Sequence, residues 1–188
     1  SKIGSRPTNT SARAGSAVSR HFANSALPSG EHGGGRVLLR KFACSGRSRM
    51  TRCVLDSSVV VAALRPAESH SLDALRVLER IERGAIAVYL PVVVPVEVAG
   101  AIRRRTGHAK FASDAVARLL SLRNVSIIDL TVSRVHRCIG IASVCALRGM
   151  DAVVVATAEE FGVPLVTLDS EMAMRAAPYV EILDVRSL

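Results

Sequence analysis

The feature that most constrains the fold is a short apolar run at residues 53–55, which ends in a carboxylate and continues at once as an apolar, helix-like segment. An apolar run without alternation is typical of a strand that is covered on both faces in a parallel sheet. Asp56 follows this run, and open α/β sheets place their ligands outside the carboxyl ends of the strands. The sequence therefore predicts a buried strand that delivers Asp56 to a ligand-binding edge.

Strand-like and helix-like patterns alternate from Met50 to the end of the chain. Further strands are predicted at 85–90, 125–130 and 165–168, with an edge strand at 182–185. Helices are predicted up to Leu64, from a cap at Ser69 or Ser71 to Gly84, at 92–105, at 110–122, from Thr131 or Ser133 to Gly149, and at 151–161. This alternation predicts an α/β fold with a mainly parallel central sheet flanked by helices on both faces.

Helical periodicity also predicts which side of two helices faces the core. In the helix that ends near Gly84, the inward stripe is expected to be Leu72, Leu75, Leu78 and Ile81. In the helix that ends near Gly149, it is expected to be Val135, Ile139, Ala142 and Ala146. Cys138 and Cys145 are seven residues apart on this second helix and are predicted to share a buried face.

Positive charge is concentrated in residues 1–49, which hold nine basic residues and one acidic residue, whereas the remainder holds 16 and 15. The high net charge of +9 therefore does not indicate a nucleic-acid-binding face on the fold. We interpret 1–49 as a disordered basic leader and 50–188 as the folded domain. The leader's composition suits a transit peptide or an RNA-attracting tail, but Met50, directly before the first strand, favours a segment outside the native start.

The four cysteines, Cys44, Cys53, Cys138 and Cys145, show no C-x-x-C pairing. They are expected to be reduced core residues of a cytoplasmic protein. No apolar run approaches the roughly 20 residues that span a bilayer, so no membrane contact is expected.

Four acids stand in apolar surroundings: Asp56, Glu97, Asp151 and Asp169. Each has an ordinary structural explanation, because the three aspartates precede predicted helices and Asp is a good N-cap. Glu97 lies among valines, and its structural explanation is that an acid in the first turn of a helix interacts favourably with the positive end of the helix dipole. Considered together, four carboxylates brought to one sheet edge repel each other and require a cation. Oxygen ligands in that number suit Mg²⁺ or Mn²⁺ better than zinc.

Four blocks that contain these acids resemble a known family. They are Val54-Leu55-Asp56-Ser57-Ser58, then Pro91-Val92-Val93-Val94-Pro95-Val96-Glu97-Val98, then Met150-Asp151-Ala152, and finally Leu165-Val166-Thr167-Leu168-Asp169. In order and spacing they resemble the PIN-domain ribonucleases, and among these the VapC toxins of VapBC toxin–antitoxin modules. The resemblance spans 50–188 and excludes 1–49.

The resemblance implies a PIN-like fold in which Asp56, Glu97, Asp151 and Asp169 form the catalytic, metal-binding quartet. Ser57 or Ser58 would support the first acid, Thr167 would support the site, and Glu171 would be a water-mediated ligand or a solvated acid. The implied reaction is Mg²⁺- or Mn²⁺-assisted hydrolysis of RNA that leaves 5′-phosphate and 3′-hydroxyl ends.

The basic run Arg103-Arg104-Arg105 follows Glu97 on the same predicted helix. It is predicted either to bind substrate phosphates or to stabilise the negative C-terminal end of the helix. Aromatic residues make up 3% of the chain, so a base-stacking platform is not expected. The family resemblance implies an RNA substrate, a cognate VapB-like antitoxin and a homodimer.

Three functions stay open from the sequence. The first is a toxin-like endoribonuclease held inactive by an antitoxin. The second is a PIN-domain nuclease of RNA processing or decay that has no antitoxin. The third is a non-catalytic binding module that keeps its acids for structure. An antitoxin reading frame beside this one would separate the first two, and loss of cleavage on replacing Asp56 would exclude the third.

Overall fold

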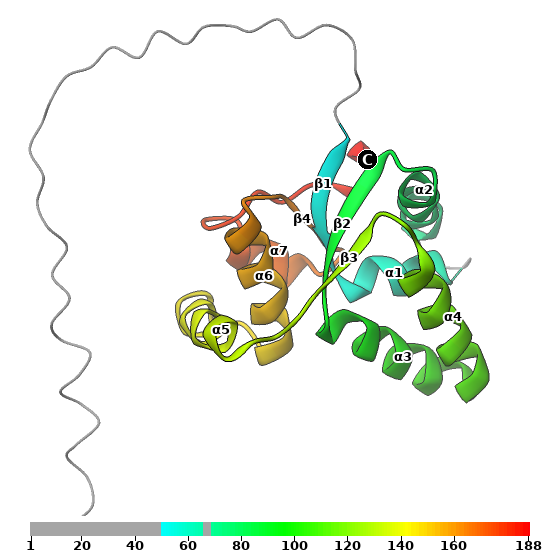
Figure 1. Cartoon of the computed structure of the whole chain (residues 1–188), viewed down its shortest axis with the longest axis horizontal. Helices are drawn as coiled ribbons and strands as arrows, with labels where there is room; N and C mark the ends of the chain where they lie inside the picture. Colours follow the sequence, from blue (N-terminus) through cyan, green and yellow to red (C-terminus); the bar gives the residue numbers. More distant parts are fainter. Residues whose placement is uncertain (1–49, 66–68) are drawn as a thin grey trace, which may run out of the picture. The chain divides into compact units, whose positions relative to one another are not determined.

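In the computed structural model, which describes residues 50–65 and 69–188, four parallel strands form one sheet (Figure 1). They are β1 Thr51–Leu55, β2 Ile86–Pro91, β3 Val125–Ile128 and β4 Leu165–Val166, in the order β3-β2-β1-β4. In the central strand, Val54 pairs with Tyr89 on one side and with Leu165 on the other. The parallel sheet expected from the sequence is confirmed, whereas the leader predicted at 1–49 lies outside the described residues.

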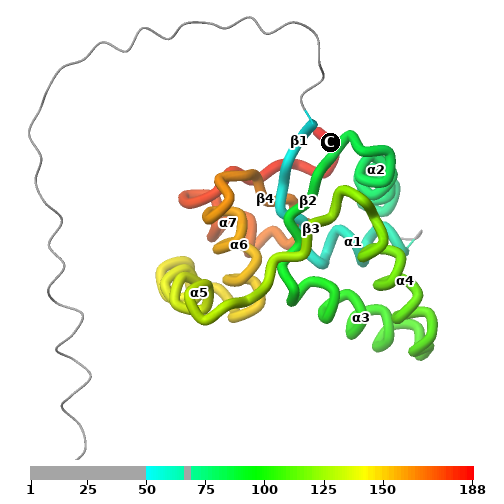
Figure 2. Tube along the Cα trace, viewed as in Figure 1, coloured from blue at the N-terminus to red at the C-terminus, as the bar shows by residue number. Residues whose placement is uncertain are grey.

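Helices cover both faces of this sheet. In the described residues they are α1 Ser57–Ala63, α2 Ser71–Glu82, α3 Val93–Thr106, α4 Ala109–Ser121, α5 Val132–Cys145, α6 Gly149–Phe161 and α7 Ser170–Ala176. Figures 1 and 2 show α5, α6 and α7 on one side of the strands and α1, α2 and α4 on the other. α6 packs against β1 and β2 from its side, and α2 packs against β2 from the other.

The burial of β1 and of β3 follows their places in the sheet, while the short edge strand β4 is buried. Residues 53–55 of the central β1 are fully buried, which explains their unbroken apolar run. The edge strand β3 is half-exposed and correspondingly mixed in composition. Within the described residues, no single helix is long and apolar enough to cross a membrane, although α5 and α6, bent by 108° at their junction, reach that length and composition together.

Three local predictions were wrong. Residues 182–185 form no strand: Ile182 makes one bridge to Leu165, and Val185 begins a short 3₁₀ helix, η1 Val185–Ser187. α5 ends at Cys145 because Ala146 adopts a left-handed conformation, so the helix stops four residues before Gly149. α2 begins after His70, whose side chain makes no capping hydrogen bond, rather than after a serine cap.

The predicted inward faces of α2 and α5 also differ from the structure. α2 buries Ser71, Ala74, Val77 and Ile81, while Leu72 is 70% exposed. α5 buries Cys138, Ile141 and Cys145, while Ile139 is 57% exposed. Both helices carry apolar residues on more than one face, so periodicity alone was right for part of each set: Ile81 is buried and Leu78 and Ala142 pack against the core. The shared buried face of Cys138 and Cys145 is confirmed.

Two matched substitutions test the corrected face of α2. Val77→Ala removes fully buried methyl groups and is expected to lower the free energy of unfolding by about 2 kcal/mol. Leu72→Ala removes an exposed side chain and is expected to change it by less than about 0.5 kcal/mol. Urea unfolding followed by circular dichroism measures both values. A larger loss for Leu72→Ala than for Val77→Ala would contradict this orientation of the helix.

Candidate active site

Asp56 lies at the carboxyl end of β1, where it is 3% exposed and caps α1. Its Oδ2 atom accepts hydrogen bonds from the Ser58 backbone N–H at 3.2 Å, the Ser58 hydroxyl at 2.5 Å and the Thr167 hydroxyl at 2.9 Å. In the part of the chain that the structure describes, no residue donates a hydrogen bond to Oδ1. One carboxylate oxygen is thus held by the protein, and the second is left for another ligand.

The two hydroxyls that hold Asp56 also connect the ends of β1 and β4. The Leu168 N–H donates to Ser58 Oγ at 2.9 Å, and the Asp169 N–H donates to Thr167 Oγ1 at 3.0 Å. Each hydroxyl therefore accepts a hydrogen bond from a backbone amide and donates one to Asp56, an arrangement in which the hydrogen bonds strengthen one another. The prediction that Thr167 supports the site agrees with this geometry.

Asp169 and Asp151 occupy different helix positions. Asp169 caps α7, because its Oδ1 accepts the Met172 N–H at 2.9 Å, and it is solvent-exposed. Asp151 was predicted to precede its helix as a cap, but Arg148 is the cap residue and Asp151 lies inside the first turn of α6. It is half-buried there, on the side of the sheet opposite α1.

The acids influence one another electrostatically. Burial raises the pKa of Glu97, a hydrogen bond from the Ser57 side chain lowers it, and the charges of Asp56 and Asp151 raise it further. Burial also raises the pKa of Asp151, as do the charges of Asp56 and Asp169, and Arg148 lowers it. Nearby like charges disfavour the ionised form of an acid. The acids that follow β1 and β4 and the acids of α3 and α6 are therefore electrostatically coupled, and Asp151 and Asp169 line one pocket.

Sheet topology explains this coupling. β1 and β4 are adjacent parallel strands, so Asp56 and the segment that carries Thr167 emerge at the same edge. β2 pairs with β1 on its other side and leads directly into α3, which carries Glu97 in its second turn. α6 contacts both central strands and brings Asp151 to the same edge.

A divalent cation fits the chemistry of this site. Hard carboxylate oxygens are the ligands that Mg²⁺ and Mn²⁺ prefer, and a cation would relieve the repulsion that raises the pKa of Glu97 and of Asp151. The free Oδ1 of Asp56 is a suitable ligand atom. Among the described residues, however, no three His, Cys, Asp or Glu side chains already lie close enough together to hold an ion.

Two pockets flank the acids. A pocket of about 110 Å³ on the α6–α7 side is lined by Arg148, Asp151, Asp169 and Glu171, among others. A larger pocket of about 540 Å³ lies on the α1–α3 side and is lined in part by Ser57, Ser58, Leu168 and Arg105. Glu171 therefore lines the same pocket as Asp169, but it also forms an ion pair with Arg175 at 2.8 Å.

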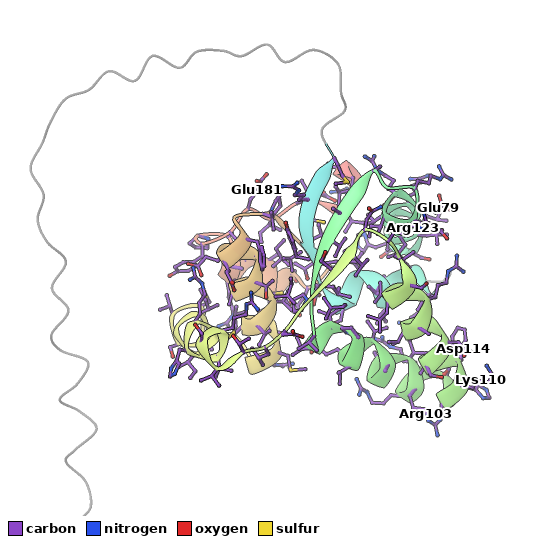
Figure 3. The ribbon with its side chains drawn as sticks, in the orientation of Figure 1. Glu79, Arg103, Lys110, Asp114, Arg123 and Glu181 are labelled. Carbon is purple, nitrogen blue, oxygen red and sulfur yellow. The ribbon has the colours of Figure 1, made fainter. Side chains whose placement is uncertain are left out.

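The three predicted substrate-binding arginines diverge around α3. The Arg103 side chain donates to the carbonyl of Gly107, the left-handed residue that ends the helix, and points outward from it (Figure 3). Arg104 lies against Gly100. Of the three, Arg105 alone lines the pocket beside Ser57. Arg103 therefore has the position expected of a residue that stabilises the helix C-terminus. Arg105 has the position expected of a residue that contacts substrate, and its role stays a prediction.

Sequence reasoning missed two arginines near the acids. Arg148 precedes Asp151 by less than one helical turn and faces it electrostatically. Arg175 donates to the carbonyl of Ala146 at 2.8 Å and so braces the connection between α5 and α6. Neither stands beside an apolar run that ends in an acid, which was the signal that identified the other residues. His70, His108 and His136 are exposed, and the other two histidines lie outside the described residues.

Residues 53–177 match the sequence model of the PIN domain. The chain belongs to the PIN-domain family. PIN domains are typically metal-dependent nucleases, and PIN nucleases generally use divalent metals. No curated protein matches the chain.

Solved structures with the fold of this PIN domain include a VapC toxin and VapBC complexes. The Mycobacterium tuberculosis VapC20, a sarcin–ricin loop cleaving toxin, is 21% identical with a TM-score of 0.57, over 69% of this chain and 98% of that one. VapBC2 from Rickettsia felis, bound to a DNA fragment from its promoter, is 14% identical with a TM-score of 0.55, over 71% and 98%. FitAcB from Neisseria gonorrhoeae is 19% identical with a TM-score of 0.55, over 72% and 99%. At these identities the likeness establishes the fold.

Removing the Thr167 hydroxyl tests its role as a support of Asp56. Thr167→Val keeps the shape of the side chain but leaves Asp56 Oδ2 with one hydrogen bond fewer and the Asp169 N–H without its acceptor. Because such outer supports typically affect metal affinity or activity 10- to 100-fold, a loss of about that size in metal affinity is expected. Isothermal titration with Mn²⁺ measures it. Thr157→Val is the control, because this buried hydroxyl bonds only within α6.

Proposed function

We propose that this protein is a Mg²⁺- or Mn²⁺-dependent endoribonuclease and the toxin of a type II toxin–antitoxin system, with Asp56, Glu97, Asp151 and Asp169 as its acidic centre. The observation that carries the proposal is the convergence of these acids from four separate elements around a buried carboxylate with one free oxygen. A purely structural acid has no need for two further half-buried acids nearby, whose repulsion destabilises the fold. This favours a nuclease over a non-catalytic module.

The chain's own residues would perform distinct tasks in the reaction. Asp56 and Asp151 would be the principal ligands of the ion, and Glu97 and Asp169 would bind it or orient water. A divalent ion held there would acidify water and neutralise charge on the phosphate. Ser58 and Thr167 keep Asp56 oriented, and the Ser57 side chain holds Glu97. His70 lines the larger pocket beside Ser57, whereas no described residue that lines the pocket of Asp151 and Asp169 is a histidine, so the acids are the groups that would accept the proton from the attacking water.

Partners are part of the same proposal. The similar structures include VapBC and FitAB complexes with DNA, and by likeness we propose a VapB-like antitoxin for this chain. A homodimer is proposed as well, and exposed apolar side chains on α5, such as Val132 and Ile139, are consistent with a covered surface. Light scattering of the purified protein measures its oligomeric state. A cytoplasmic location is part of the same proposal.

The test is cleavage of total RNA with Mg²⁺ or Mn²⁺, followed by mapping of the new ends. Wild type is expected to produce a limited set of 5′-phosphate ends, and both EDTA and Asp151→Asn are expected to abolish them. Asp114→Asn is the control, because Asp114 is an exposed acid paired with Lys110 on α4, far along the chain from the centre (Figure 3). Equal cleavage by Asp151→Asn would refute the proposed centre. An antitoxin frame beside this gene would favour the toxin over an RNA-processing nuclease.

A further inference from the structure

A groove runs from the acidic centre between α1 and α3 toward α4. Its near part is the 540 Å³ pocket, which shares Ser57 and Ser58 with the support of the acids. Its far part is a pocket of about 170 Å³ that ends at Phe111 of α4. Both parts are lined by Val61 and Arg105, so they adjoin along these two side chains. The larger part falls within the roughly 300–1,000 Å³ of typical ligand pockets.

The charge of the groove differs from that of the other pockets. Of the described residues that line its two parts, none is acidic, and the guanidinium of Arg105 lines both. The pocket on the other side of the acids is lined by three carboxylates, and the apolar pocket between α2 and α4 is lined by Glu79 and Glu82. A polyanion that reaches the acidic centre therefore meets least repulsion along the groove.

Two side chains in the groove have the chemistry that binds single-stranded RNA. Arg105 is exposed at its middle and can contact a phosphate oxygen. Phe111 is 47% exposed at its far end and presents an aromatic ring for stacking on a base. Ser69 and His70 add hydrogen-bonding groups near the centre. From an aromatic content of 3% no base-stacking platform was expected, but a composition does not show where a single exposed ring lies.

Resting on the proposed nuclease function, we propose that this groove holds the single-stranded RNA next to the cleaved bond, with Arg105 on a phosphate and Phe111 under a base. Arg103 and Arg104 lie outside the groove and do not take part. A base can stack on Phe111 only when it is free of its own strand partner.

Binding is tested without cleavage, with full-length protein, EDTA and a short fluorescein-labelled single-stranded RNA of random sequence. Arg105→Ala is expected to weaken binding at least about threefold and to reduce the slope of log affinity against log salt by about 0.7, the value for one phosphate contact on a single strand. Phe111→Ala is expected to weaken binding about fivefold or more with an unchanged salt slope. Duplex RNA of the same sequence is expected to be insensitive to Phe111→Ala.

Two matched controls separate the groove from general effects. Arg80→Ala removes an equal charge from the exposed face of α2, and Leu120→Ala removes an apolar side chain that is 45% exposed on the same helix as Phe111. Both are expected to bind RNA within about twofold of wild type. Thermal melting confirms that each variant is folded. If Arg104→Ala or Arg80→Ala weakens binding as much as Arg105→Ala, the basic character of the chain as a whole explains the affinity and the proposal is overturned.

Cleavage distinguishes failure of this inference from failure of the nuclease function. With Mn²⁺, Arg105→Ala is expected to raise KM and leave kcat nearly unchanged, because it removes binding rather than chemistry. Cleavage by wild type together with unchanged RNA binding by the Arg105 and Phe111 variants would overturn the groove alone and would favour a polypeptide as its occupant. Binding through both residues without any cleavage would support the groove and refute the nuclease.

Discussion

Asp56→Asn is expected to lower RNA cleavage by at least about 10²-fold while leaving the fold intact. The substitution removes the buried negative charge that the metal requires. The Asn side-chain oxygen can still accept the three hydrogen bonds that now reach Oδ2, and Asn is as good an N-cap as Asp for α1. The measurement is the cleavage rate of total RNA with Mn²⁺, alongside the melting temperature.

Asp56→Ala is the informative companion to this variant. It removes the acceptor as well as the charge, so the buried hydroxyls of Ser58 and Thr167 lose their partner at a cost of about 1–3 kcal/mol. Both variants should be inactive, but only the alanine variant should melt at a lower temperature. Residual cleavage within tenfold of wild type in Asp56→Asn would show that the reaction does not depend on this carboxylate.

Asp151→Asn is expected to stabilise the metal-free protein and to abolish its stabilisation by Mn²⁺. Burial and the charges of Asp56 and Asp169 raise the pKa of Asp151 above its ordinary value of 3.8. An acid whose pKa is higher in the folded than in the unfolded state does not destabilise the fold while it is protonated. It destabilises the fold when it ionises, so stability is lost as the pH rises through the raised pKa. The asparagine variant avoids this loss and should melt a few degrees higher at neutral pH, about 1–4 °C.

The pH dependence of the melting temperature tests whether ionisation of Asp151 causes this difference in stability. The difference in melting temperature between Asp151→Asn and wild type should be near zero below pH 3.8, where both side chains are uncharged, and should grow as the pH approaches neutrality. Saturating Mn²⁺ reverses the order, because binding at about 100 times Kd stabilises wild type by about 2.7 kcal/mol, and the variant lacks a ligand. If Asp151→Asn is less stable than wild type in EDTA at neutral pH, the ionised Asp151 does not destabilise the metal-free fold, and the explanation by repulsion is wrong.

Three of the four candidate acids carry a local mark in the sequence. Asp56 and Asp169 end apolar runs, and both are helix caps in the structure. Glu97 stands among valines, and an unpaired acid in such surroundings requires an explanation. The supporting hydroxyls were predictable only in kind: Ser57 or Ser58 could have held Asp56, and the structure gives Ser58 to Asp56 and Ser57 to Glu97.

The inward faces of α2 and α5 were not predictable in the same way. In α2, Leu72 and Leu75 are more apolar than Ala74 and Val77, yet the smaller pair is buried. α2 packs against α1 and β2, and a close-packed core accepts only side chains of fitting volume. In addition, a helix that carries apolar residues on two faces satisfies the helical periodicity in either orientation. The directions of Arg103, Arg104 and Arg105 likewise depend on how α3 is rotated about its axis.

The sequence by itself determined the alternation of strands and helices, the parallel sheet and the acids at the strand ends, because these follow from chain-local patterns of apolar and polar residues. Only the tertiary structure decided which oxygen of Asp56 is held and which is free, which serine supports which acid, and that Arg105 and Phe111 line one groove. These depend on contacts between residues up to 111 positions apart, and their distances are set by packing around the sheet rather than by any local pattern.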